Sequence, residues 1–68
     1  LLNMCHHLTP REFEIIKLVS SGLTSEEIAD KIFLSVHTVN THRRNILEKT
    51  GKGHISDVIF SLKDQGLL

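Results

Sequence analysis

The pattern Leu-Thr-x-x-Glu occurs twice in the first half of this chain, at residues 8–12 and 23–27. In each copy the threonine is placed to cap a helix, and the glutamate three positions later is placed to return a hydrogen bond to the cap, which makes a capping box. Phe13 and Ile28 follow the two glutamates and complete hydrophobic staples with the leucines. The pattern therefore predicts two helices that begin after Thr9 and Thr24, the first of which ends at Gly22.

Two further helices are predicted in the second half. One follows a cap at Ser35, covers about residues 36–49, and is stopped by Gly51 and Gly53. The last begins near Ser56 and ends before Gly66. No alternating pattern of strand type interrupts them, so the predicted fold class is all-α with four helices.

The second and third predicted helices have the layout of a helix-turn-helix. The second is short, and Ala29 stands where two helices must approach closely. Phe33 and Leu34 then leave only a tight link before the longer third helix, with the fourth helix at the C-terminal end.

The size of the chain limits what it can do. Its 68 residues suffice for one small domain, and 40% hydrophobic and 4% aromatic residues support a compact aliphatic core. A buried catalytic cleft would be hard to fit, so we expect no enzyme and no cofactor. No apolar run is long enough to cross a bilayer, and a single cysteine excludes an internal disulfide, so we expect a cytoplasmic protein. We expect residues 8–68 to be the domain and residues 1–7 to be a linker remnant from a longer protein.

The predicted helix at residues 36–49 has one unusually polar side. At about 100° per residue, Val36, Val39, Ile46 and Leu47 share the core side. The opposite side and its flanks carry the polar set His37, Thr41, Arg44, Asn40, Thr38 and Asn45. Arginine can bind guanine through two hydrogen bonds, and asparagine can recognise adenine, so this side suits a DNA major groove. Polarity alone is also compatible with a solvated face.

Charge distribution favours the DNA hypothesis. The chain has no net charge, but residues 31–54 carry a balance of +4, and residues 1–30 one of −3. The basic residues of the middle segment are Lys31, Arg43, Arg44, Lys49 and Lys52. Overall neutrality thus conceals a basic patch around the third predicted helix, as expected of a DNA-binding surface.

The sequence resembles a known family, the LuxR/GerE-type helix-turn-helix domain of bacterial transcription regulators. The resemblance covers the chain from Leu8 almost to the C-terminus. Its most specific parts are the segments LTPRE, GLT, EIA, TV, THR and NIL at residues 8–12, 22–24, 27–29, 38–39, 41–43 and 45–47. It implies four helices, the second and third forming the helix-turn-helix, in the C-terminal output domain of a larger regulator.

The resemblance also implies roles for individual residues. Asn40, Thr41 and Arg44 would face the bases, and His37 joins them on the helical wheel. The predicted phosphate-contacting residues are Thr24, Lys31, Ser35, Thr38, His42, Arg43, Asn45 and Lys49. The family often has lysine where Asn40 stands, so the base preference is not carried over.

The fourth predicted helix has more apolar residues than one narrow core-facing stripe needs. Most of them are expected to close the core, and an excess residue such as Phe60 could join a twofold interface. The candidate dimer residues are Ile55, Val58, Ile59, Phe60 and Leu62. The expected partners are double-stranded DNA, a second copy of the chain on DNA, and RNA polymerase as a further candidate. We expect no membrane and no small-molecule ligand for this domain.

Other interpretations stay open at this point. A sigma-factor helix-turn-helix region shares the LT-x-x-E start and the EIA segment. A helical module that binds protein and no DNA would also fit four helices. Cys5, His6 and His7 raise the question of zinc, but adjacent residues cannot easily bind one ion, so no metal is expected.

Overall fold

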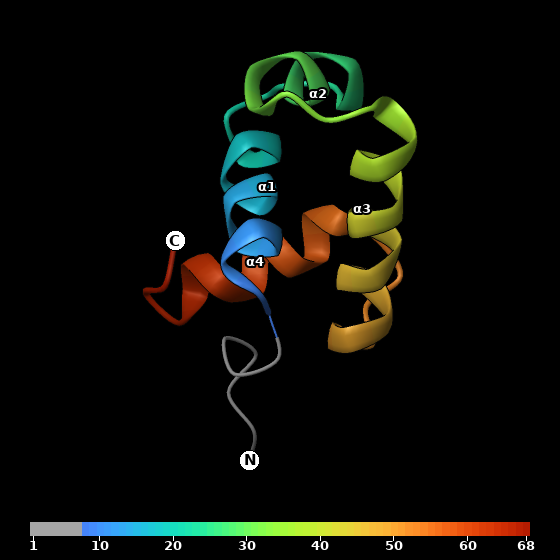
Figure 1. The fold of residues 1–68 in the computed structure, drawn as a ribbon. Helices are drawn as coiled ribbons and strands as arrows, with labels where there is room; N and C mark the ends of the chain where they lie inside the picture. Colours follow the sequence, from blue (N-terminus) through green and yellow to red (C-terminus); the bar gives the residue numbers. More distant parts are fainter. Residues whose placement is uncertain (1–7) are drawn as a thin grey trace.

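The computed structural model describes residues 8–68, and this part consists of four helices without a strand (Figure 1). They are α1 (Pro10–Ser20), α2 (Ser25–Ile32), α3 (Val36–Thr50) and α4 (Ile55–Asp64). Helices α1 and α3 form two opposite sides of the molecule, and α2 lies across one end of both. Helix α4 crosses behind them near the other end (Figure 1). The all-α prediction and the order of the four helices are confirmed.

Both predicted capping boxes are present. The Thr9 hydroxyl accepts from Glu12 N at 3.1 Å, and Glu12 Oε1 accepts from Thr9 N at 2.9 Å. At the start of α2 the same two bonds join Thr24 and Glu27 at 3.2 and 2.8 Å. Each box gives acceptors to two backbone N–H groups that the helix start would otherwise leave unpaired.

The helix ends show one feature that the sequence pattern missed. Gly51 ends α3 with φ of 71°, as its lack of a side chain allows. The residue that ends α2, however, is Phe33, with φ of 59° and 93% exposure. The backbone N–H groups of Phe33 and Leu34 both donate to the Ala29 carbonyl, which makes the tight turn into α3. The turn thus holds an aromatic residue in a left-handed conformation that L-residues adopt at an energetic cost.

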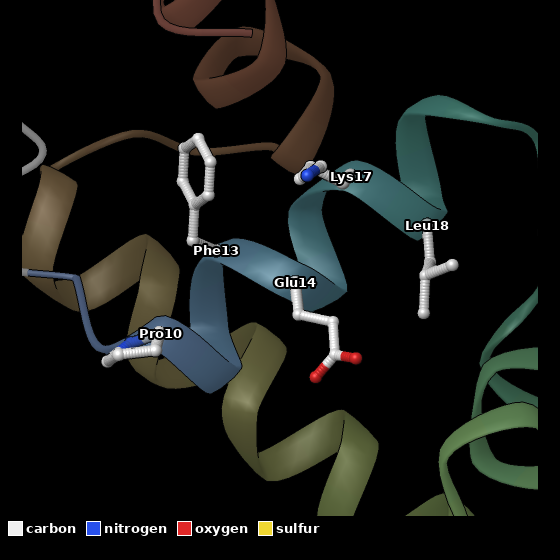
Figure 2. A pocket seen from close by; sticks show the side chains of 5 residues that line it. All are labelled: Pro10, Phe13, Glu14, Lys17 and Leu18. Carbon is white, nitrogen blue, oxygen red and sulfur yellow. The ribbon is translucent and has the colours of Figure 1, made fainter.

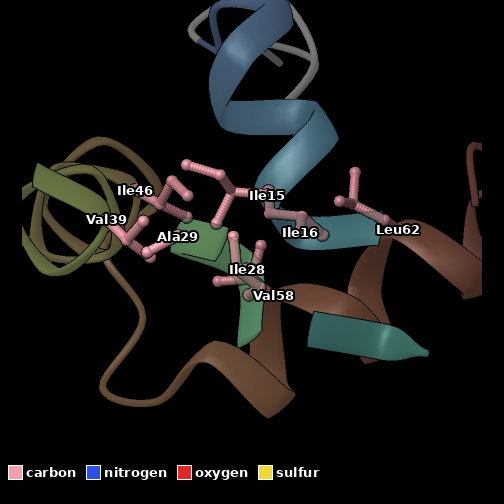
Figure 3. Packing of buried hydrophobic residues seen from close by; sticks show 8 residues of the cluster. All are labelled: Ile15, Ile16, Ile28, Ala29, Val39, Ile46, Val58 and Leu62. Carbon is pink, nitrogen blue, oxygen red and sulfur yellow. The ribbon is translucent and has the colours of Figure 1, made fainter. Parts of the chain in front are cut away.

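All four helices contribute to one aliphatic core (Figure 3). Seven of its eight side chains are fully buried, and Ala29 is 5% exposed. The core residues are Ile15, Ile16, Ile28, Ala29, Val39, Ile46, Val58 and Leu62. Truncating one such isoleucine or leucine to alanine destabilises a domain by about 2–5 kcal/mol, so this cluster fixes how α3 is presented. None of the helices between residues 8 and 68 has the length and apolar character to cross a membrane.

Candidate nucleic-acid interface

The polar side of α3 forms a narrow exposed stripe. His37, Asn40, Arg44 and Glu48 are all exposed and are spaced by three or four residues, which places them in one row along the helix. We call these four residues the α3 stripe. On the opposite side Val39 and Ile46 are fully buried in the core. Three of the residues predicted to face bases thus share one outward row, although their contact with bases remains a prediction.

One residue of the stripe is bonded to another helix. The Ser25 hydroxyl, in the first residue of α2, donates to Asn40 Oδ1 at 2.8 Å. Ser25 is half-buried and Asn40 is exposed. The bond therefore orients the Asn40 amide at the edge of the stripe.

Thr41, the fourth residue predicted to face bases, lies differently. It is half-buried, and its hydroxyl donates to the His37 carbonyl at 3.0 Å, one turn earlier in α3. This intrahelical bond uses the hydroxyl proton, so Thr41 presents its methyl group and an acceptor oxygen. The methyl group could still contact a thymine methyl.

The predicted phosphate-contacting residues fall into two groups. Three lie at helix starts: the N-cap residues Thr24 and Ser35 accept backbone N–H bonds, and the hydroxyl of Thr38, in the first turn of α3, lies 2.8 Å from the Ser35 hydroxyl. The second group contains the exposed Lys31 and the half-buried side chains of His42, Arg43 and Asn45. Their contact with phosphate stays a prediction.

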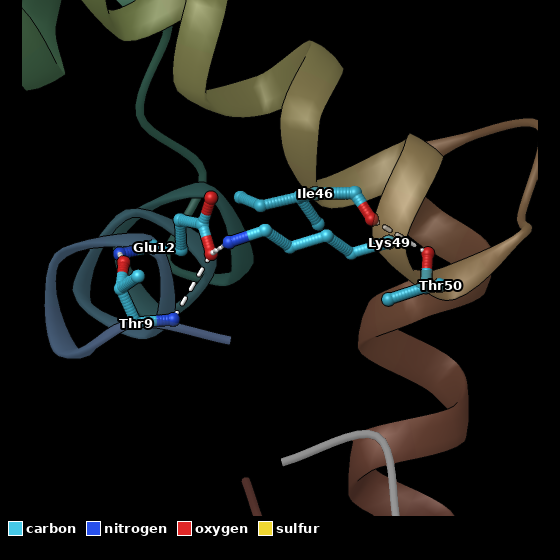
Figure 4. A network of polar contacts seen from close by, with 5 residues as sticks. All are labelled: Thr9, Glu12, Ile46, Lys49 and Thr50. Carbon is cyan, nitrogen blue, oxygen red and sulfur yellow. Dashed lines mark hydrogen bonds and ion pairs between the residues drawn. The ribbon is translucent and has the colours of Figure 1, made fainter. Parts of the chain in front are cut away.

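Lys49, the last member of that predicted set, takes part in a contact inside the protein. Its Nζ donates to Glu12 Oε1 at 2.8 Å and so joins α3 to the start of α1 (Figure 4). Glu12 is 2% exposed, and the same oxygen also accepts from Thr9 N. Because a buried carboxylate needs such partners, Lys49 stabilises Glu12, and its contact with phosphate stays a prediction.

These contacts shift the ionisation of Glu12. Burial by itself raises the pKa of this carboxyl, but hydrogen bonds from Lys49 and Thr9 and the charge of Lys49 outweigh that effect. The pKa of Glu12 is therefore lowered from its ordinary value of 4.5. The carboxylate is held in its charged form at neutral pH.

The structure corrects part of the predicted dimer surface on α4. Val58 and Leu62 are fully buried in the core of the monomer, so they are not available to a second copy. Ile55 and Ile59 are half-buried and pack against that core. Phe60 alone of the five candidates is largely exposed, at 72%.

An open pocket of about 320 Å³ lies on α1 (Figure 2). Its lining residues are Pro10, Phe13, Glu14, Lys17 and Leu18. All belong to α1, so the pocket is separate from the α3 stripe. Between residues 8 and 68 no three metal-ligating side chains lie close enough to hold an ion, and Cys5, His6 and His7 are outside the described residues.

Comparison with known proteins gives the class to which this fold belongs. Residues 6–62 match the family model for bacterial regulatory proteins of the luxR family. This chain belongs to that family, and the resemblance drawn from the sequence motifs is confirmed in preference to a sigma-factor region.

The structure is also similar to a solved structure described as response regulator ChrA in a heme-sensing two-component system. The two share 34% sequence identity with a TM-score of 0.81. The match covers 90% of this chain and only 30% of that one. The chain thus corresponds to less than a third of that response regulator's length.

Two contacts of α3 with other helices were not predicted from the sequence. Ser25 was not considered beside Asn40, and Glu12 was assigned only to the capping box. Each contact joins residues from different helices, 15 and 37 positions apart. The sequence shows that these residues are polar, but only the packing of the helices shows which polar residues contact one another.

Proposed function

We propose that this domain binds double-stranded DNA in a sequence-specific manner, as the output domain of a bacterial transcription regulator. Helix α3 enters the major groove with the α3 stripe toward the base edges. The single observation that supports this most strongly is the exposed row of His37, Asn40 and Arg44 on the second helix of a luxR-family helix-turn-helix. The proposal gives the domain a binding role and no chemistry.

Arg44 is the residue we assign to the main base contact. It is exposed, and among residues 8–68 it forms no ion pair that would compete for its guanidinium group. A guanidinium fork matches the O6 and N7 acceptors of guanine. Asn40 and His37 lie one and two turns earlier on the same row and would contact neighbouring base pairs.

Phosphate contacts would position α3 in the groove. We assign them to the exposed Lys31 at the end of α2 and to Arg43, His42 and Asn45 on the flank of α3. The hydroxyls of Thr24, Ser35 and Thr38 at the helix starts complete this set. Glu48 closes the stripe at its C-terminal end, where a carboxylate would repel phosphates, so the contact is expected along the part of α3 before Glu48.

We further propose that two copies bind DNA as a homodimer. The exposed Phe60 on α4, with Ile59 beside it, is the apolar surface available for this contact. A twofold dimer would place two α3 helices roughly 34 Å apart on a partly palindromic site. The family and the likeness to part of a response regulator support a cytoplasmic regulator, in which RNA polymerase would be a further partner.

A selection from randomised duplex DNA tests the proposal. The 68-residue chain is mixed with the pool, and the affinity of the enriched sequences is measured at several salt concentrations. We expect a defined motif whose affinity falls steeply with salt, because the basic patch displaces counterions from phosphates. Sequence-independent binding, or no binding at low salt, would contradict sequence-specific recognition by α3.

A further inference from the structure

We propose that Ser25 determines which base Asn40 recognises. Ser25 would act as a positioning residue: its hydroxyl holds the Asn40 side chain by the 2.8 Å bond to Oδ1, and Asn40 alone would touch the base. The inference rests on the proposed DNA-binding function and deepens it. It concerns a position at which the family often carries lysine, so the family resemblance supplies no base preference there.

The surroundings of the bond favour this orientation of the amide. Ser25 is the first residue of α2, where the backbone N–H groups of the first turn and the helix dipole make a positive end. A carbonyl oxygen facing that end is stabilised, and an amino group facing it would be repelled. The Asn40 oxygen is therefore directed toward α2, and its Nδ2 group is directed away from α2.

The tether changes the hydrogen-bonding character of Asn40. A free asparagine binds adenine with two bonds, since its oxygen accepts from N6 and its amide nitrogen donates to N7. Oδ1 has a second lone pair that could accept another bond, but the bond to Ser25 turns this oxygen away from the groove. Asn40 then offers the groove only N–H donors.

A donor-only side chain favours a base edge that carries acceptors. Guanine presents two acceptors, O6 and N7, whereas adenine presents one acceptor beside an amino group that would be left without a partner. Cytosine presents an amino donor in the major groove and is disfavoured. We therefore expect guanine, and not adenine, at the base pair that faces Asn40.

The expected position of that base pair follows from the helix geometry. Asn40 and Arg44 are four residues apart on one row, which corresponds to about 6 Å along α3. Since successive base pairs rise by about 3.4 Å, the two contacts should lie within roughly two base-pair steps of each other. Asn40→Ala identifies the position directly, as the one at which base preference is lost.

The test compares base preferences of the 68-residue chain and four variants in the same selection. Wild type should prefer guanine at the position defined by Asn40→Ala. Ser25→Ala, which frees the amide, should shift that preference toward adenine and lower the guanine-to-adenine ratio by about tenfold. Ser25→Thr keeps the hydroxyl and should retain guanine. The double variant Ser25→Ala/Asn40→Ala should match Asn40→Ala.

This ratio is insensitive to a uniform loss of folded protein, because both sequences compete for the same molecules. If wild type binds a defined motif but Ser25→Ala leaves the preference unchanged, the inference is overturned and the proposed function stands. Adenine preference in wild type would overturn it equally. If wild type shows no sequence preference at all, the proposed function and the inference fail together.

Discussion

Helix α3 is bonded to its neighbours at two places that differ sharply in burial. Near its C-terminal end, Lys49 donates to Glu12, a carboxylate that is only 2% exposed. Near its N-terminal end, Asn40 accepts from Ser25 at the exposed edge of the stripe. Both bonds are 2.8 Å long and join side chains across two helices.

The difference in burial separates stability from recognition. Removing a partner from a buried charge leaves that charge without compensation, whereas losing an exposed bond between neutral groups costs the folded state little, because water takes the place of the missing partner. The contact at Glu12 should therefore matter for folding. The contact at Ser25 should matter for DNA preference and hardly for folding.

Glu12→Ala should give the largest effect. It removes the ion pair with Lys49 and half of the α1 capping box, so we expect the free energy of unfolding to fall by about 2–3 kcal/mol in chemical denaturation. Glu12→Gln, which keeps an oxygen to accept from Lys49 and Thr9, should lose about half as much. Equal, negligible losses in both variants would mean that the buried contact is not stabilising.

The same carboxyl predicts a dependence of stability on pH. The pKa of Glu12 is lowered in the folded state, so the folded protein binds its proton less readily than the unfolded chain. Its contribution to stability should be fully present above its ordinary pKa of 4.5 and should be lost as pH falls through the lowered folded value. Denaturation at a series of pH values, with Glu12→Gln as the control, measures this, and a steeper acid loss in the variant would contradict it.

Arg44→Ala should weaken binding to the best DNA site by about 1–3 kcal/mol and relax preference at one base pair, with unfolding unchanged. The matched control is Arg11→Ala, which removes the same charge from α1, where Arg11 pairs with Glu14 at 3.3 Å. Affinities measured on the selected site and on a scrambled duplex distinguish a base contact from a phosphate contact. Equal losses on both duplexes would make Arg44 a phosphate contact.

Phe33→Gly should give the smallest effect and the only gain in stability. Phe33 has φ of 59° and is 93% exposed, so glycine would relieve a left-handed conformation and remove little packing. We expect a gain of about 1 kcal/mol, measured by thermal or chemical unfolding. Phe33→Ala, which keeps the strain, is the control, and a loss on Phe33→Gly would show that the ring is needed.

The helix starts and most helix ends could be predicted because their signals are local. Thr9 and Thr24 with their glutamates marked two starts, and Gly51 marked an end. The last helix was placed near Ser56, whereas α4 begins at Ile55 after His54, whose side chain makes no capping bond. A start without a side-chain cap gives no sharp local signal, which explains the difference of one residue.

The site was predictable to a smaller degree, because its details depend on how helices pack. The helical period placed His37, Asn40 and Arg44 on one polar side. It could not show that Asn40 is bonded to Ser25, or that Lys49 serves Glu12, since both pairs form only when α3 packs on its neighbours. Likewise Val58 and Leu62 were possible interface residues until packing placed them in the core.

The proposed DNA-binding surface is the part of α3 from His37 to Asn45. Titrating the isotope-labelled chain with its selected duplex and following backbone amide NMR shifts tests it most directly. We predict that the largest changes fall on His37, Asn40, Thr41 and Arg44 and on the start of α2, with small changes in the α1 pocket. Changes concentrated on α1 or α4, with α3 unaffected, would contradict the assignment.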